Sequence, residues 1–162
     1  MNLIVGIGLV LLVAGLGWYV YVQLTVPTLY GDWAGTIYLY DKVESADGTQ
    51  TNTYEIEFKL TFTQAGDDTA STGGSVLGTM VLNGEPWSSQ PDTLEFVGLL
   101  SRSEETPTLT LSAQGKQPNE EGLTPSIGLK GQWEGNRIQG VLGVNDVHGF
   151  AFLEGEWFVE KK

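Results

Sequence analysis

The sequence predicts an all-β protein, an eight-stranded antiparallel up-and-down barrel, preceded by one N-terminal transmembrane α-helix. Three observations support this prediction. Residues 3–22 are almost wholly apolar, and the first charged side chain is Asp32. Several later segments alternate apolar and polar residues, which is typical of half-buried strands. Clusters rich in glycine, asparagine and aspartate separate these segments and favour turns, so that few residues remain for helices.

The N-terminal apolar run has the length of a membrane span. At about 1.5 Å per residue, a helix over residues 3–22 is about 30 Å long and matches the hydrocarbon core of a bilayer. No basic residue precedes the run and no small-residue cleavage site follows it, so we expect a retained anchor rather than a cleaved signal peptide. We therefore expect an anchor helix over residues 1–26, a linker over residues 27–31 and a soluble barrel over residues 32–162.

Two groups of residues within the span have expected roles. Aromatic rings favour the depth of the lipid headgroups, so three residues at the end of the span mark a membrane interface: Trp18, Tyr19 and Tyr21. Small residues let a second helix approach closely, and glycine is also common in membrane helices generally. Four residues are the candidates for such helix packing: Gly6, Gly8, Gly15 and Gly17. The span has no ionisable side chain, so we expect an anchor and no ion path.

The clearest predicted strand covers residues 54–63, where every second side chain is apolar from Tyr54 to Phe62. The same alternation predicts seven further strands, over residues 33–39, 75–82, 93–101, 108–113, 127–134, 136–144 and 149–160. Short strands that follow one another with turns between them indicate an up-and-down meander. Closure into a barrel would remove the exposed strand edges.

A short motif opens the first predicted strand, where Gly31 lies two residues before Trp33. A G-x-W at the start of an eight-stranded meander resembles the calycin barrels, the lipocalins and avidins, in which this tryptophan plugs one end of the barrel. The resemblance implies a plugging role for Trp33. A glycine also lies two residues before Trp133 and Trp157, so these two are further expected plug residues. Neither the helix that follows the barrel in lipocalins nor their T-D-Y motif is present, so no ligand specificity is implied.

The sequence leaves open whether the barrel is filled or hollow, because eight strands enclose a space that side chains can fill or that can hold one small ligand. Large residues such as Trp33, Phe58 and Phe96 are predicted to face inward together with glycines such as Gly78 and Gly131. We expect the large residues to pack against the glycines and fill the core. A small apolar ligand is the alternative.

The hairpin formed by residues 75–82 and 93–101 is apolar on both faces. An outward apolar patch is a candidate surface for a partner protein or the membrane, and a loop of the same chain over residues 114–122 is an alternative cover. The candidate contact residues are the four outward side chains and the tryptophan of the connecting loop: Leu77, Val81, Val97, Leu99 and Trp87.

Catalytic and metal-binding signatures are absent from the sequence. The single histidine, His148, follows Asp146 closely in a predicted hairpin loop, where a solvated turn residue is expected. Paired carboxylates occur only in polar, turn-like stretches, and there is no cysteine, metal-ligand spacing or phosphate-binding glycine loop. We therefore expect no enzymatic activity, no cofactor and no bound metal.

The charge balance restricts the partners. The chain has 20 acidic and 8 basic residues, a net charge of −12. Such a domain repels nucleic acid and anionic lipid headgroups, and it would attract a basic soluble protein. Solubility and resistance to aggregation require no partner and are the simpler reason for the charge.

The predicted function is that of a non-enzymatic, single-pass accessory subunit. It would stabilise or dock onto a larger integral membrane complex, of the kind found in respiration or photosynthesis, with integral membrane subunits and the lipid bilayer as partners. An N-terminal anchor followed by a domain poor in lysine and arginine favours a barrel outside the cytoplasm, on the periplasmic side. The alternative is a membrane-tethered, lipocalin-like carrier of a small apolar ligand, and a hydrolase or lyase is a third hypothesis.

Overall fold

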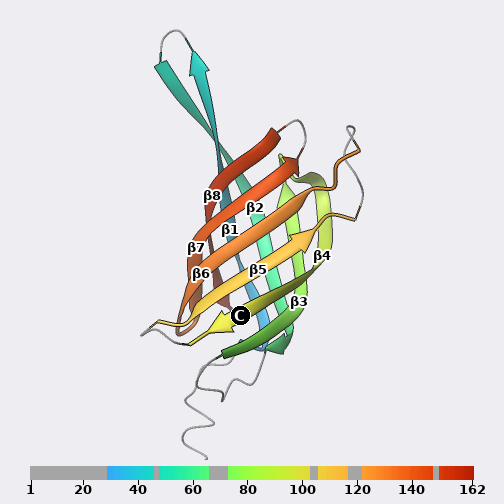
Figure 1. Cartoon of the computed structure of the whole chain (residues 1–162), viewed down its shortest axis with the longest axis vertical. Helices are drawn as coiled ribbons and strands as arrows, with labels where there is room; N and C mark the ends of the chain where they lie inside the picture. Colours follow the sequence, from blue (N-terminus) through green and yellow to red (C-terminus); the bar gives the residue numbers. More distant parts are fainter. Residues whose placement is uncertain (1–28, 46–47, 66–72, 103–105, 117–121, 148–149) are drawn as a thin grey trace, which may run out of the picture.

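The computed structural model describes residues 29–45, 48–65, 73–102, 106–116, 122–147 and 150–162. Eight antiparallel strands follow one another around a closed barrel in the order of the chain (Figure 1). The predicted up-and-down barrel is therefore confirmed. The expected anchor over residues 1–26, with its glycines and its aromatic cluster, lies outside the described residues.

Every predicted strand is present, and most are longer than the alternation indicated. Each strand pairs with the next, and β8 pairs with β1 to close the barrel. The strands are β1 (Gly31–Ser45), β2 (Gly48–Ala65), β3 (Gly73–Gly84), β4 (Ser88–Ser101), β5 (Thr108–Gln114), β6 (Ser126–Glu134), β7 (Arg137–Val147) and β8 (Phe150–Lys161).

The two ends of the barrel differ. At one end, which we call the Trp33 end, β1 begins and β8 ends, with Trp33 opposite Lys161 in the register. At the other end, the ribbon end, β1 and β2 continue beyond the neighbouring strands (Figure 1). Along β1, only residues 33–40 pair with β8, whereas pairing with β2 continues to Ser45.

The projecting part, residues 41–45 and 48–53, forms what we call the β1–β2 ribbon. Its side chains are polar on both faces apart from Val43, and none of those described is buried. Sequence alternation ended the first strand at residue 39 and began the second at residue 54, because alternation reports contact with a core. The ribbon has no core on either side, so this signal was absent there.

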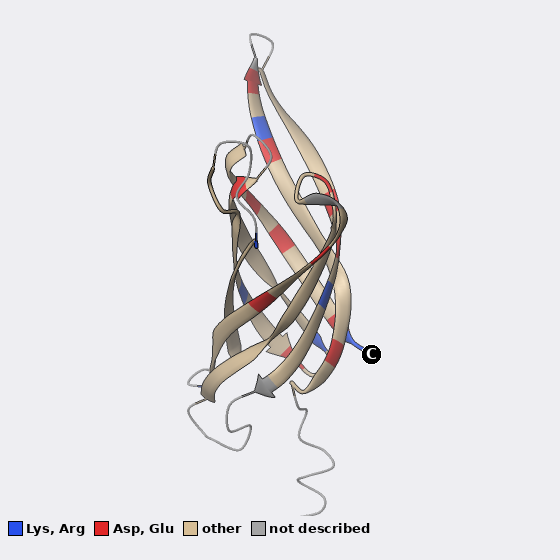
Figure 2. Cartoon of the chain, turned by 90° about the vertical axis from the view of Figure 1, so that its right-hand side faces the viewer, with Lys and Arg blue, Asp and Glu red and all other residues tan. Residues whose placement is uncertain are grey.

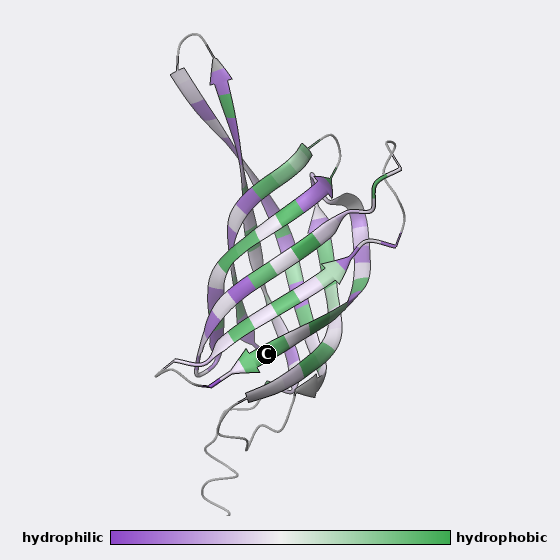
Figure 3. Ribbon diagram, in the orientation of Figure 1, coloured by the Kyte–Doolittle hydropathy of each residue, from purple (hydrophilic) through white to green (hydrophobic). Residues whose placement is uncertain are grey.

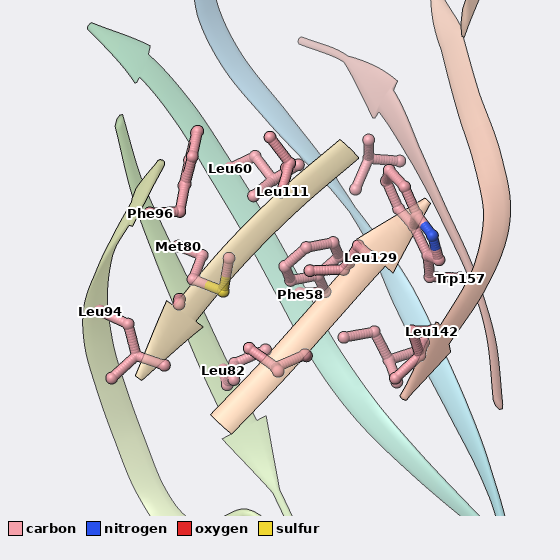
Figure 4. Close-up of a cluster of buried hydrophobic side chains, with 14 of the residues drawn as sticks. Phe58, Leu60, Met80, Leu82, Leu94, Phe96, Leu111, Leu129, Leu142 and Trp157 are labelled. Carbon is pink, nitrogen blue, oxygen red and sulfur yellow. The ribbon is translucent and has the colours of Figure 1, made fainter. Parts of the chain in front are cut away.

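One face of each strand builds the interior. Hydropathy alternates along the strands in Figure 3, and the inward side chains form one apolar cluster. Large members from different strands meet in the middle of the barrel, among them Phe58, Met80, Phe96 and Trp157 (Figure 4). No polar or charged residue is buried among the described residues.

Candidate interaction surfaces

The chain is fixed to the barrel before the first strand begins. Leu29 is fully buried, and the indole Nε1 of Trp33 donates a hydrogen bond to its carbonyl oxygen at 2.9 Å. The Trp33 ring also lies edge-on to Phe62, with the centroids 6.4 Å apart, and the Lys161 ammonium lies 5.6 Å from its centroid. The segment over residues 27–31, expected to be a linker, therefore contributes a core residue. Its apolar leucine was overlooked because the flanking residues lack strand alternation.

Two of the three expected plug residues lie at the Trp33 end. Trp133 is 6% exposed at the end of β6, where its Nε1 donates to the Gly135 carbonyl at 2.8 Å and the Arg102 guanidinium lies 5.6 Å from its ring centroid. Trp157 lies deeper, four residues before Lys161, and packs edge-on against Phe58 at 5.9 Å between centroids. Trp33 and Trp133 thus close one end, and Trp157 fills the middle.

Aromatic rings occupy the space beside the inward glycines. A Cβ atom added to Gly78 would lie 2.6 Å from Cζ of Phe96, and one added to Gly131 would lie 2.6 Å from Cζ2 of Trp157. Phe96 in turn contacts Phe62 edge-on, with centroids 5.3 Å apart. The expected packing of large residues against glycines is confirmed at these positions.

Three hollows lined by described residues open on the outside of the barrel wall. Two of them, of about 420 and 460 Å³, adjoin each other on the outer face of β6 to β8, around Gln139 and Gly140. A third, of about 330 Å³, lies where β1 separates from β8 and is lined by Tyr40, Phe152 and their neighbours. These hollows are open to solvent, unlike the enclosed pocket of a carrier.

An apolar patch lies on the outer wall of β3 and β4. Leu77, Val97 and Leu99 are 38, 59 and 62% exposed, and we call these three residues the wall patch. Leu77 is opposite Val97 in the register, and Leu99 is two residues from the last residue of β4. The wall patch therefore lies in the half of the barrel next to the Trp33 end. The fourth expected residue, Val81, is half-buried.

Trp87 does not belong to the wall patch, in contrast to the expectation from the sequence. It is 6% exposed and is part of the core cluster at the ribbon end. Its Nε1 donates to a carboxylate oxygen of Asp92 at 3.2 Å. Burial removes the large ring from water while Asp92 of β4 satisfies its polar atom, so an exposed position would be less stable.

Two exposed apolar side chains on β7 and β8 are among those that the sequence analysis missed. Val141 on β7 is 60% exposed and Phe152 on β8 is 53% exposed. The sequence alternation could have predicted their exposure, since both residues occupy positions that alternate with the buried residues of their strands. Phe152 borders the hollow between β1 and β8.

Acidic side chains gather toward the ribbon end. Figure 2 shows acidic residues along the ribbon and the upper strands, and basic residues near the C-terminus. One pair has an electrostatic consequence: the Tyr40 hydroxyl donates a hydrogen bond to Glu156. Burial of the Tyr40 phenol, together with the negative charge of Glu156, raises its pKa above the ordinary value of 10.0.

The described residues present no catalytic constellation that we can identify. No group of three metal-ligating side chains gathers in this part of the chain. His148 lies outside the described residues, and its neighbour Asp146 has a positive φ of 58° at the end of β7. Across the same described ranges, no helix is long and apolar enough to cross a membrane.

Comparison with known proteins does not assign this chain to a family. Comparisons with protein-family models, with curated proteins and with solved structures found no significant match. The strand order and the closure of β1 onto β8 are compatible with a calycin-like barrel.

Proposed function

We propose that the chain is a non-enzymatic, single-pass accessory subunit, anchored by residues 1–26, that docks onto a larger integral membrane complex. The barrel lies on the periplasmic side in this proposal. The observation that carries it is the position of the wall patch in the half of the barrel where Leu29 is held by Trp33. Both features place apolar surface close to the point at which the chain enters the barrel.

The short segment between the apolar run and the barrel would keep the wall patch close to the membrane. Between Val22, where the apolar run ends, and the buried Leu29, an extended chain reaches at most about 25 Å. Leu99 is two residues from the end of β4, about 7 Å along the strand. A membrane protein beside the anchor could therefore contact the wall patch without any further tether.

The packing of the interior favours this function over that of a carrier. A carrier requires an enclosed apolar cavity of about 300 Å³ or more. Phe96 and Trp157 occupy the space beside Gly78 and Gly131, which is where the sequence pattern would have left room. As part of the same proposal, we infer a calycin-like barrel, on the basis of Trp33 at the start of the first strand.

Extraction of native membranes with a mild detergent tests the proposal. We expect the chain to migrate in a large assembly and to copurify with integral membrane proteins. Migration as a free monomer would contradict the accessory role. Retention of a small apolar molecule through purification, detected by native mass spectrometry, would favour the carrier instead.

A further inference from the structure

We propose that the ribbon end of the barrel binds an extended, basic segment of a partner protein by β-strand addition at the seam between β1 and β8. The seam is formed by residues 41–45 of β1 and 150–153 of β8. This inference goes beyond the accessory role, because it specifies a second surface, a binding mode and the chemistry of its ligand.

The first argument is the presence of two open strand edges. Within the part of the chain that the structure describes, residues 41–45 of β1 pair only with β2 and residues 150–153 of β8 pair only with β7, since the β1–β8 ladder stops at Tyr40 and Glu154. Along the outer edge of an antiparallel pair, every second residue directs its backbone N–H and C=O outward. Such an edge is a template for another strand, and an isolated two-stranded ribbon is marginal in water by itself.

The second argument is the shape and apolar content of the seam. Where the two strands separate, they leave a hollow of about 330 Å³ lined by Tyr40, Asp41, Lys42, Phe152, Leu153 and Glu154. Phe152 is 53% exposed at this hollow, and Val43 on the ribbon is 43% exposed. Val43 continues the inward-facing phase of β1, whereas Phe152 lies on the outward face together with Glu154. Apolar side chains at alternate positions of an added strand would therefore cover Val43, and the aliphatic stems of basic side chains on its other face would lie over Phe152.

The third argument is charge. Three exposed carboxylates lie on the outward face of the two strands near the seam, together with the exposed Lys42: Glu44, Glu154 and Glu156. Asp41 is half-buried on the opposite face, where it accepts a hydrogen bond from the Asn52 side chain. Lysine or arginine side chains on the polar face of an incoming strand would complement these carboxylates and accelerate its association. The ligand that fits is therefore an extended segment in which basic and apolar residues alternate.

A second copy of the chain fits this seam poorly, and this step rests on the proposed anchoring. Two copies in one bilayer would point their ribbons in the same direction, whereas antiparallel pairing of two equivalent edges requires opposite directions. In-register parallel pairing would place Asp41 beside Asp41 and Glu44 beside Glu44. Like charges directly opposite each other on adjacent strands are destabilising.

The test uses the full chain in detergent micelles and a short peptide of alternating lysine and valine. A matched peptide with N-methyl groups at alternate residues keeps the charge but lacks the outward N–H donors. We expect the unmodified peptide to bind and to protect amides within residues 41–45 or 150–153 from hydrogen exchange. The N-methylated peptide should bind at least about tenfold more weakly.

Two variants locate the site. Phe152→Ser should weaken peptide binding about tenfold, whereas Val141→Ser, which removes an equally exposed side chain from another face, should leave it unchanged. Replacement of residues 42–51 by Asn-Gly joins Asp41 to Asn52, which are opposite each other in the register, and should abolish binding. No core residue is lost, so this variant should keep the thermal midpoint of the wild type.

Several outcomes would overturn the proposal. Equal binding of the two peptides would show attraction by charge alone, and no binding at about 1 mM peptide would remove the site. Self-association with protection of residues 41–45 would identify a second copy as the occupant. The peptide assay uses the isolated chain, so a failure of the peptide to bind would not contradict the accessory role. Conversely, finding the chain as a monomer in native membranes would contradict the accessory role but not the peptide binding.

Discussion

The indole N–H of Trp33 donates to the carbonyl oxygen of Leu29, and both residues are buried at one end of the barrel. The hydrogen bond spans four residues, so it ties the segment before β1 to the start of that strand. The barrel and the preceding chain therefore meet at a fixed point.

Trp33→Phe is expected to lower the free energy of unfolding by about 2 kcal/mol. The substitution leaves the buried Leu29 carbonyl without its donor and removes ring volume from the core. Denaturant unfolding followed by circular dichroism measures the change. Phe152→Leu, at an exposed position, is the matched control and should shift stability by less than about 0.5 kcal/mol. Equal stability of Trp33→Phe and the wild type would contradict the role assigned to this contact.

Gly78→Ala is expected to lower the free energy of unfolding by about 1–3 kcal/mol. The added methyl group would clash with the Thr61 carbonyl oxygen and would lie 2.6 Å from Cζ of Phe96, so backbone and ring must both move. Gly128→Ala is the control, because a Cβ there has open space around it. That variant should be neutral or slightly stabilised. Equal thermal midpoints of Gly78→Ala and Gly128→Ala would contradict the close packing of Phe96 against Gly78.

Leu99→Glu is expected to release the chain from its native assembly. The side chain is 62% exposed in the wall patch, and a carboxylate at an apolar interface would be desolvated without a partner. Val141→Glu changes an equally exposed residue on β7 and should leave the assembly intact. Native electrophoresis of mildly solubilised membranes compares the two, and thermal unfolding checks that both variants fold. Release by both variants, or by neither, would count against the wall patch.

The folded protein should lose stability as the pH rises above about 10, in part because of Tyr40. Burial and Glu156 raise the pKa of the Tyr40 phenol in the folded state, so the unfolded chain releases this proton first. The stabilisation is complete below the ordinary pKa and is lost as the pH rises toward the folded value. Tyr40→Phe should flatten this part of the pH profile, and Glu156→Gln should lower the pKa of Tyr40 in phenolate absorbance titrations. An unchanged profile in Tyr40→Phe would assign the loss to other groups.

The barrel could be predicted because the core leaves a period-two pattern in the sequence. Strand β2, which includes Phe58, and strand β6, which includes Trp133, show this directly, since alternate residues are buried. The β1–β2 ribbon was not predicted, because strands that do not pack against a core show no such pattern. The burial of Leu29 and Trp87 was missed for a different reason: both residues lie outside the strands, and their hydrogen bonds to Trp33 of β1 and Asp92 of β4 form only in the folded chain.

The interaction surfaces were predictable only in part. The alternation correctly predicted outward positions for Leu77, Val97 and Leu99, because it fixes which face of a strand each residue occupies. It could not show that they lie near the Trp33 end, which depends on the register between β3 and β4. The seam between β1 and β8 depends on where their pairing stops, and sequence alternation does not report that.

Alkaline carbonate extraction of native membranes tests the central claim, that the chain acts while held in the bilayer by its N-terminal segment. We expect the protein to remain in the membrane pellet, with residues 1–28 present by mass spectrometry of the intact chain. Recovery of a soluble polypeptide lacking this segment would contradict the account.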